Sequence, residues 1–349
     1  MNTPSPLSEA GEFRLECIGV RQETHVAKTY LFAHPAGQFR FNPGQFLNFV
    51  FEIDGEEHIR SYSLSSSALN AENVSVTVKR VQGGRVSNWL FEHMRPGLQV
   101  RASGPMGQFS CGLEPETPLL LLTAGSGITP AASMLQSLAD KASTCDVLLV
   151  HFASSAQDMI FREHMRRWVE ALPGLRIVPV VTRHIPGAGW IGPVARLSSD
   201  LLRALAPDVA QRHVYCCGPG GFMDLATLML KQMGHPPDGV FIESFESARE
   251  DDNIGSAAEA GSAQFTVTFA KAGLTASVDA ETTVLKAAKV AGARIQTSCG
   301  KGVCGTCRVR MLSGTVEMKH QGGIRQREID QGFILACCSR PTSDVVIEK

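Results

Sequence analysis

The sequence has no excess of charge of either sign and no long apolar run. Its 349 residues carry 33 Lys and Arg against 34 Asp and Glu, a net charge of -1. Without a basic surplus we expect no nucleic-acid partner and no attraction to an acidic membrane surface. The longest apolar runs, such as residues 119–122, are far shorter than the roughly 20 residues of a membrane span.

Secretory signals and paired histidine motifs are also missing. The first residues, MNTPSP, have neither the basic start nor the apolar stretch of a secretory signal, which predicts a cytoplasmic protein with reduced thiols. The ten histidines contain no H-E-x-x-H or similar paired spacing, so they indicate no metal motif. The ten cysteines are unevenly distributed, because five of them lie between Cys299 and Cys338.

Hydrophobic periodicity predicts two different folds in the first 246 residues. In residues 1–113, apolar positions recur at period two between turns of Pro, Gly, Asp and Asn, notably at 40–51 and 74–78, which predicts an antiparallel barrel. In residues 114–246, short apolar strands alternate with amphipathic helical segments, which predicts an open parallel α/β sheet. These strands are expected at 119–123, 147–152, 177–182, 213–216 and 240–243.

The remaining chain is expected to form a linker and a small third domain. Residues 247–263 are small or charged, cannot form a core and predict a flexible linker. Residues 264–349 begin with a hairpin pattern at 265–269 and 275–278, followed by a helical stretch at 282–291. We therefore expect a small α+β domain at the C-terminal end.

Four cysteines of this last domain have the spacing of an iron-sulfur site. Cys299, Cys304 and Cys307 form C-x4-C-x2-C, and Cys337 follows after 29 further residues, which is typical of a plant-type [2Fe-2S] cluster. The interleaved glycines let the backbone fold tightly around sulfide and point N–H groups at it. A zinc site, the alternative, usually shows two C-x2-C pairs. Cys338 competes as fourth ligand, but we favour Cys337, because the two side chains face opposite ways if the apolar strand before them continues.

Two runs in the predicted barrel suit a flavin. The run RSYSLSS places Arg60 and Tyr62 on one strand face and Ser61 and Ser63 on the other. An aromatic ring, a cation and a hydroxyl can stack a flavin, hold a phosphate and hydrogen-bond the reactive nitrogen, although serine-rich strands are also common. The run GGRVSNWL at 83–90 is a glycine turn entering a helix, whose free N–H groups can receive a pyrophosphate.

Together the two runs resemble the flavin domain of the ferredoxin–NADP reductase superfamily. The glycine turn and the run GPMGQF at 104–109 are similar to FAD-binding members, so the resemblance implies FAD rather than FMN. It also implies a set of flavin contacts, among which Ser63 takes part in catalysis. These residues are Arg60, Ser61, Tyr62, Ser63, Val78, Lys79, Arg80, Gly84, Val86 and Ser87.

Two further runs resemble the nicotinamide domain of the same superfamily. The run LLLTAGSGITP at 120–130 reads as strand, glycine turn and helix start, with Pro130 where the usual dinucleotide motif has its third glycine. Cys217-Gly218-Pro219 stands at the end of the fourth parallel strand, where ligands of open α/β sheets bind; a buried pair of Cys216 and Cys217 is the alternative. The implied nucleotide contacts are Gly125, Gly127, Thr129, Cys217, Gly218 and Pro219.

The end of the second domain resembles the superfamily's terminal acid and aromatic residue. The resemblance implies that Cys217 lies beside the nicotinamide, that Glu243 handles protons, and that Phe245 covers the flavin until nicotinamide displaces it. Here the chain continues past Phe245 into the linker. Residues 154–158 offer hydroxyls but no neighbouring arginine for a 2′-phosphate, which favours NADH over NADPH.

The order of the three domains resembles reductase components of two-component Rieske oxygenases that act on quaternary amines such as glycine betaine or carnitine. The resemblance implies that the third domain is a β-grasp ferredoxin domain, and that electrons pass from NADH through FAD and the [2Fe-2S] cluster to a terminal oxygenase. Reductases of hybrid-cluster proteins and of phenylacetyl-CoA-type monooxygenases share most of these features. A redox-sensing module without turnover is the non-enzymatic alternative.

Overall fold

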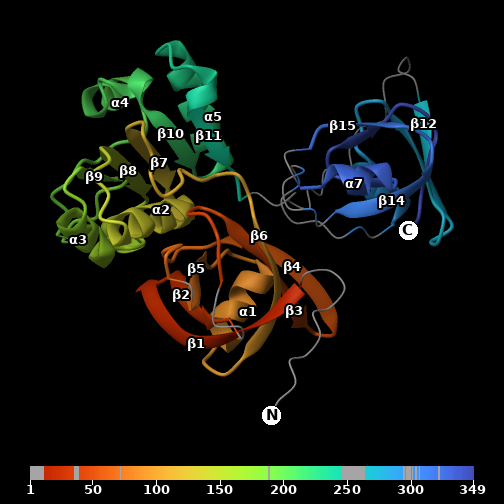
Figure 1. The fold of residues 1–349 in the computed structure, drawn as a ribbon, viewed down its shortest axis with the longest axis horizontal. Coiled ribbons are helices and arrows are strands. Elements are labelled where there is room, and N and C mark those ends of the chain that lie inside the picture. The colour runs from red at the N-terminus through yellow and green to blue at the C-terminus, as the bar shows by residue number, and fades with distance from the viewer. Residues whose placement is uncertain are drawn as a thin grey trace. The chain divides into compact units, whose positions relative to one another are not determined.

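The computed structural model describes residues 12–34, 39–70, 72–187, 189–245, 264–293, 295, 300, 302, 305, 307–320 and 323–349. The chain forms two compact units, Met1–Phe245 and Glu246–Lys349 (Figure 1). The predicted linker, residues 247–263, lies outside the described residues. A domain boundary at residue 113 stays a prediction.

The first unit begins with a six-stranded antiparallel sheet in the order β4-β3-β6-β1-β2-β5. A bridge between Leu64, which follows β4, and Val76 of β5 joins the two edges of this sheet, so it closes into the predicted barrel. The strand predicted at 40–51 begins only at Phe46, because Pro43 and Gly44 form a turn. The elements are β1 Glu12–Thr24, β2 Ala27–Ala33, β3 Phe46–Ile53, β4 Glu56–Ser63, β5 Asn73–Lys79, α1 Arg85–His93 and β6 Gln99–Met106.

The second sheet of this unit has five parallel strands in the order β11-β10-β7-β8-β9. All five strands predicted from the sequence are present, with ends shifted by at most two residues. The strands are β7 Leu119–Ala124, β8 Val147–Ala153, β9 Leu175–Val181, β10 His213–Cys217 and β11 Val240–Glu243, and the helices are α2 Ile128–Asp140, α3 Arg162–Ala171, α4 Ser199–Leu205 and α5 Gly220–Gln232.

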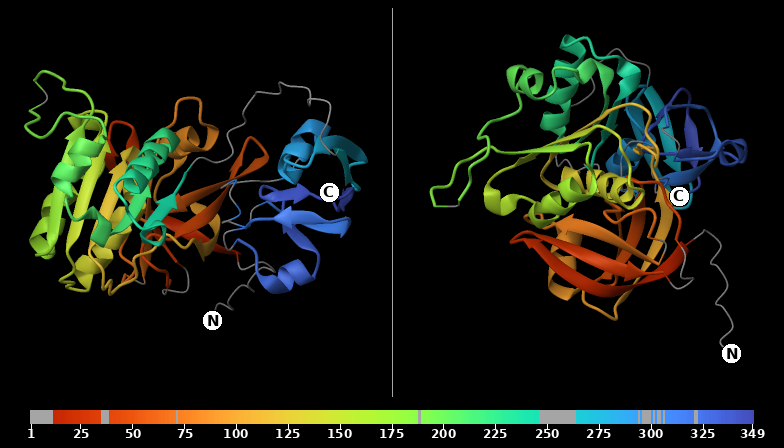
Figure 2. Two further views of the ribbon diagram at one scale, coloured as in Figure 1. Left: turned by 90° about the horizontal axis from the view of Figure 1, so that it is seen from above. Right: turned by 60° about the vertical axis from the view of Figure 1, so that its left-hand side comes forward.

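Helices cover both faces of the parallel sheet (Figure 2). Leu119 and Leu121 pack on the side of α2 and α3, whereas Leu120 and Leu122 pack on the side of α4 and α5. Burial on both faces explains why these strands are continuously apolar instead of alternating. In the described part of the chain, no helix is long and apolar enough to cross a membrane.

The chain order of the parallel strands creates a switch point beside β7. From β7 the chain proceeds outward to β8 and β9, and it then returns to β10 on the other side of β7. Open α/β sheets bind ligands at such a point, outside the carboxyl ends of the strands. The turns that follow β7 and β10 are therefore the first place to look for a ligand site.

The second unit contains a mixed five-stranded sheet, β13-β12-β18-β14-β16, with helix α6 packed on it, and a separate pair, β15-β17. The predicted hairpin and helix are both present. Thr283 caps α6 by accepting a hydrogen bond from the N–H of Lys286. The elements are β12 Gln264–Phe269, β13 Leu274–Asp279, α6 Val284–Ala291, β14 Arg308–Ser313, β15 Val316–Met318, α7 Gln326–Asp330, β16 Phe333–Leu335, β17 Ser339–Pro341 and β18 Val345–Ile347.

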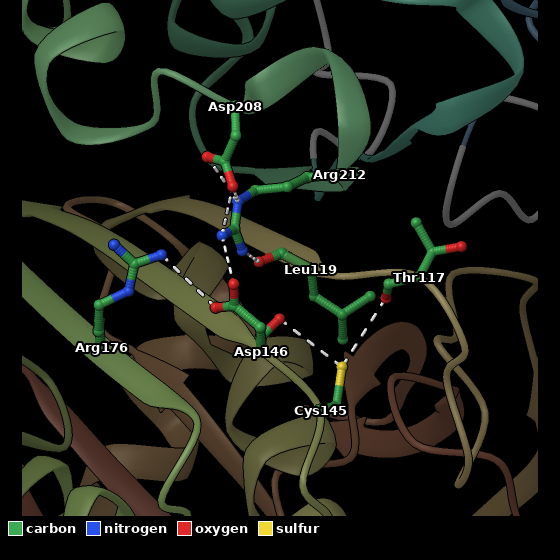
Figure 3. Close-up of polar contacts among 7 residues, drawn as sticks. All are labelled: Thr117, Leu119, Cys145, Asp146, Arg176, Asp208 and Arg212. Carbon is green, nitrogen blue, oxygen red and sulfur yellow. Dashed lines mark hydrogen bonds and ion pairs between the residues drawn. The ribbon is translucent and has the colours of Figure 1, made fainter.

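A buried arginine ties together the amino ends of the parallel strands (Figure 3). Arg212, just before β10, donates to both carboxylate oxygens of Asp208, to Asp146 at 2.6 Å and to the carbonyl of Leu119 at 3.1 Å. Its side chain is 1% exposed. The hydrogen bond from Arg212 lowers the pKa of the Asp146 carboxyl below its ordinary value. A buried charge is tolerated only with such partners.

We expect Arg212→Met to lower the free energy of unfolding of the first unit by about 2 kcal/mol, because the Leu119 carbonyl loses its buried donor. The matched control is Arg176→Met, since Arg176 contacts the same Asp146 at 3.5 Å but is 57% exposed; we expect it to change stability by less than about 0.5 kcal/mol. Urea unfolding followed by tryptophan fluorescence reports this unit alone, since all three tryptophans lie in it. Equal losses in the two variants would contradict the buried-anchor account.

Candidate functional site

A glycine turn at the end of β7 lies directly against the end of β10. Residues Gly125–Gly127 form a single 3-10 turn, and a Cβ atom on Gly127 would lie 2.1 Å from the carbonyl oxygen of Cys217. Thr129 donates to the carbonyl of Ser126 at 3.0 Å and closes the turn. No side chain caps the start of α2. The N–H of Ile128, the first residue of α2, already donates to the carbonyls of Gly125 and Ser126, so a phosphate at this edge depends on the N–H groups of the glycine turn before it.

The end of β10 supplies the other half of this edge. Cys217 is fully buried and belongs to the core on the α2 face, whereas Cys216 belongs to the core on the opposite face. A Cβ on Gly218 would lie 3.0 Å from the Cβ of Ala124 and 2.9 Å from the ring of Phe222, so a side chain in this second turn would crowd both neighbours. Pro219 precedes α5, whose start has no side-chain cap either. The predicted nucleotide residues are thus neighbours at the switch point.

A serine of the barrel meets an acid of the parallel sheet at the same place. Glu243 ends β11 in register with Cys217, and its Oε2 accepts a hydrogen bond from Ser63 Oγ at 3.0 Å, across 180 residues of chain. Burial raises the pKa of Glu243 to about 8, although the Ser63 hydroxyl lowers it. Burial, and secondly Glu243, raise the pKa of the Cys217 thiol well above its usual value. At neutral pH this edge therefore presents a protonated acid and a neutral thiol.

The predicted flavin strand is β4. Tyr62 packs against Phe49 and Phe51, with ring centroids 5.9 Å and 6.4 Å apart. Ser61 Oγ donates to Asn48 Oδ1 at 2.6 Å, on the face of the strand opposite to Tyr62. One face of β4 thus carries the aromatic ring and the other carries hydroxyls, as period-two alternation predicts.

The second predicted flavin segment surrounds the start of α1. Ser87 Oγ accepts a hydrogen bond from the Val81 N–H at 3.1 Å, and Gly84 precedes the helix without a side-chain cap. Arg80 bonds the side chains of Asn88 and Glu92 on α1. The side chains of Val78 and Val86 are buried in the barrel core. A flavin could therefore contact these two residues only through their backbone atoms. Lys79 is exposed.

Two of the four predicted cluster ligands lie among the described residues and are neighbours. Cys337 N–H donates to Cys307 Sγ at 3.5 Å, and Gly302 N–H donates to Cys337 Sγ at 3.2 Å. Gly302 and Gly305 both have φ of +73°, which favours glycine. Cys299 and Cys304 lie outside the described residues. Thiolates surrounded by backbone N–H donors are the surroundings that an iron-sulfur cluster requires.

The reason we gave for preferring Cys337 over Cys338 is wrong, because the strand does not reach them. β16 ends at Leu335, and both cysteines lie in a turn closed by the hydrogen bond from Cys338 N–H to the Leu335 carbonyl at 3.1 Å. The Cys338 thiol is directed to the same carbonyl at 3.7 Å. Cys337 contacts Cys307 and Gly302, but Cys338 Sγ lies at the same glycine turn, 2.7 Å from where a Cβ on Gly302 would stand. The choice of Cys337 as fourth ligand stays a prediction.

The sequence reading missed an arginine beside the predicted ribose site. The N–H of Arg183, after β9, donates to the carbonyl of Ser154, after β8, at 3.0 Å. In the same loop Ser155 Oγ donates to Asp158 Oδ2 at 2.7 Å. The pairing of β8 with β9 was the signal that could have found Arg183, because it brings their carboxyl ends together. The backbone of Arg183 therefore neighbours residues 154–158, and whether an arginine serves a 2′-phosphate stays a prediction.

Phe245 is 40% exposed and is the last described residue of the first unit. Its role as a cover over the flavin stays a prediction.

Three family models match consecutive parts of the chain. An oxidoreductase FAD-binding domain model matches residues 19–111, and an oxidoreductase NAD-binding domain model matches residues 121–227. A 2Fe-2S iron-sulfur cluster binding domain model matches residues 267–342. Their order is the order of the closed barrel, the parallel sheet and the mixed sheet.

Similar proteins match along nearly the whole length. The glycine betaine monooxygenase reductase subunit of Pseudomonas aeruginosa (strain UCBPP-PA14) is 36% identical over 349 residues, 97% of this chain and 95% of that protein. A stachydrine N-demethylase reductase subunit of Rhizobium meliloti (strain 1021) is 33% identical over 96% of each chain. The solved structure of phthalate dioxygenase reductase superposes with a TM-score of 0.60 at 24% identity, over 97% of this chain and 98% of that one.

We expect Cys337→Ser to reduce the iron content and the EPR signal of the purified, reduced protein severalfold, because a ligand thiolate is lost. Cys338→Ser is the matched comparison, since this thiol lies at the same glycine turn but is directed to the Leu335 carbonyl, and we expect it to leave both quantities unchanged. A Cys337→Ser protein with a full-strength cluster, or a Cys338→Ser protein without one, would contradict the assignment.

Proposed function

The chain belongs to the ferredoxin–NADP reductase-like family of FAD- and NAD-binding reductases with a 2Fe-2S ferredoxin domain, and on that premise we propose that it serves a two-component Rieske-type monooxygenase. As a family member it is an electron-transfer reductase from NAD(P)H through FAD and a 2Fe-2S cluster. Glycine betaine and stachydrine, named in its relatives, are both quaternary amines. We therefore propose quaternary-amine demethylation as the reaction of the partner oxygenase.

The observation that carries the proposal is the meeting of Ser63, Glu243 and Cys217 at the switch point. Flavin-strand and nucleotide-turn residues come together there although they are far apart in sequence. A bound FAD, held by β4 and the segment before α1, would supply the chemistry that converts a two-electron nicotinamide donor into single-electron transfer to a [2Fe-2S] cluster. The described residues suit both cofactors. The flavin would be bound by the aromatic ring and hydroxyls of β4, and the cluster would be bound by the neighbouring thiols of Cys307 and Cys337.

The residues of the chain bind, orient and hold a proton. The turn at Gly125–Gly127 faces the pyrophosphate with its backbone N–H groups, and Cys217 lies at the end of β10 where the nicotinamide binds. The Ser63 hydroxyl and the Glu243 carboxyl hold a proton between them near the flavin strand. Because the pKa of Glu243 is about 8, its carboxyl can gain or lose that proton near neutral pH.

We propose NADH as the physiological donor, on the basis of Asp158. Its carboxylate lies 2.7 Å from Ser155 Oγ after β8, where an acid binds the ribose 2′-hydroxyl and repels a 2′-phosphate. Arg183 acts in the opposite sense, because its exposed guanidinium can pair with a 2′-phosphate. The preference of this chain therefore depends on the balance between Asp158 and Arg183.

We expect Arg183→Ala to lower kcat/KM for NADPH by about tenfold through loss of one charge-assisted contact, and to leave kcat/KM for NADH within about twofold. Asp158→Asn should raise kcat/KM for NADPH and so reduce the ratio of kcat/KM for NADH to that for NADPH. Ferricyanide reduction at varied nucleotide concentration measures both effects. Arg203→Ala, which removes an exposed arginine of α4 paired with Asp200, is the control. Equal effects of Arg183→Ala on both nucleotides would contradict this account.

The partner is tested by reconstitution. The purified holoprotein with NADH should support demethylation of glycine betaine or stachydrine by a Rieske oxygenase, measured as formaldehyde released. A hybrid-cluster protein in a parallel assay is the comparison. Turnover only with the hybrid-cluster protein would overturn the oxygenase proposal, and absence of ferricyanide reduction with either nucleotide would contradict the reductase itself.

A further inference from the structure

Two buried serines of α2 connect the parallel-sheet layer to the barrel. Ser133 and Ser137 are one helical turn apart and so lie on one face of the helix. Both side chains are fully buried. Serine favours exposed positions and turns over helix interiors, so two fully buried hydroxyls on one helical face require partners that justify them.

Their partners belong to the segment that follows β4. Ser133 Oγ donates to the carbonyl of Ser66 at 2.8 Å, across 67 residues of chain. Ser137 Oγ accepts from the N–H of Ala68 at 2.8 Å and donates to the carbonyl of Ser133 at 2.7 Å. The serines thus use a donor and an acceptor from the same short stretch of barrel backbone. Two such bonds one turn apart fix both the position of α2 along its axis and its rotation about that axis, relative to the barrel segment at Ser66 and Ala68.

The hydrogen bonds between α2 and the segment after β4 join the two parts of the candidate site, the nucleotide turn and the flavin strand. Ser133 follows the glycine turn ending at Gly127 by six residues, and Ser66 follows the flavin-strand serine, Ser63, by three. The path from the nucleotide turn to the flavin strand through these hydrogen bonds is therefore short. It consists of the first turns of one helix and the first residues after one strand, with no long loop between.

Apolar packing brings the same helix close but does not orient it. A Cβ on Gly44 of the barrel would lie 2.8 Å from the Cε of Met134 and 2.1 Å from the carbonyl oxygen of Phe109, so Met134 rests on a glycine. A methionine side chain is flexible and adapts to small shifts. Hydrogen bonds depend steeply on angle as well as distance. The bonds of Ser133 and Ser137 therefore orient α2 on the barrel, whereas the contact of Met134 with Gly44 does not.

We propose that Ser133 and Ser137 are positioning residues that set the placement of the nucleotide turn relative to the flavin strand, through their bonds to Ser66 and Ala68. This inference rests on the proposed function. A misplacement of about 1 Å far from the reacting atoms can slow a positioned reaction about a hundredfold. We therefore expect loss of these bonds to slow the hydride-transfer step more than it weakens the affinity for the nucleotide, because the proposed nucleotide contacts, on the turns after β7 and β10, lie outside the barrel.

The test uses Ser133→Ala, Ser137→Ala and the double variant in the full-length holoprotein. Anaerobic stopped-flow mixing with NADH gives the rate of flavin reduction and the dissociation constant separately. We expect the rate to fall about tenfold or more in the double variant, with a weaker charge-transfer absorbance of the NAD⁺ complex. The dissociation constant should change by less than about threefold.

A second readout does not depend on activity. Hydrogen exchange of the Ala68 amide should accelerate in Ser137→Ala, in both the flavin-loaded and the flavin-free protein, because its acceptor is lost. Thr29→Val is the matched control: Thr29 is a buried hydroxyl with two hydrogen bonds, to Thr77 and Glu23, that both stay within the barrel. The control should lose stability without slowing flavin reduction.

The outcomes separate the inference from the proposed function. Flavin reduction at the wild-type rate with an unchanged charge-transfer band in the double variant would overturn the positioning role. The same rate loss in Thr29→Val would also overturn it, because the effect would then be general destabilisation. Failure of the wild-type holoprotein to accept electrons from NADH or NADPH would contradict the proposed function, while the Ala68 exchange would still decide whether the bonds exist.

Discussion

The candidate site depends on how closely the backbone of the glycine turn after β7 approaches the end of β10. Any side chain at Gly127 would collide with the Cys217 carbonyl, which a Cβ would meet at 2.1 Å. Because the two strands are neighbours at the switch point, their turns share one edge. This contact places the start of α2 beside Cys217, and the register of β11 places Glu243 next to Cys217.

Glu243 links the parallel sheet to the barrel. Glu243 is carried by the outermost parallel strand, but its hydrogen bond goes to Ser63 on the barrel. Burial keeps its carboxyl protonated at neutral pH, so no unpaired negative charge is buried there. Protonation of Glu243 avoids the cost of a buried charge, and it also leaves a transferable proton beside β4.

Local motifs in the sequence predicted most of the fold and singled out the segments that meet at the candidate site. The spacing of Cys307 and Cys337, the alternation along β4 and the glycine turn at Gly125 are all short-range signals that a single chain displays. What the sequence did not reveal depends on contacts between distant segments. Arg183 reaches Ser154 only because β8 and β9 pair, and Ser133 is an ordinary helical serine until Ser66 is placed beside it.

Two errors have the same origin. The strand predicted at 40–51 is broken by a turn whose Gly44 is held by the packing of Phe109 and Met134, and β16 ends before Cys337 because the backbone turns back to the Leu335 carbonyl. Apolar periodicity alone extends strands through such points, since it records burial and not the hydrogen bonds that end a strand.

The central claim is that electrons from the nicotinamide reach the cluster only through a flavin held at this edge. The direct measurement is EPR of the reduced cluster after anaerobic addition of NADH to the full-length protein, before and after removal of FAD. The account predicts that the signal disappears with the flavin and returns when FAD is restored. A cluster that NADH reduces equally well without flavin would contradict it.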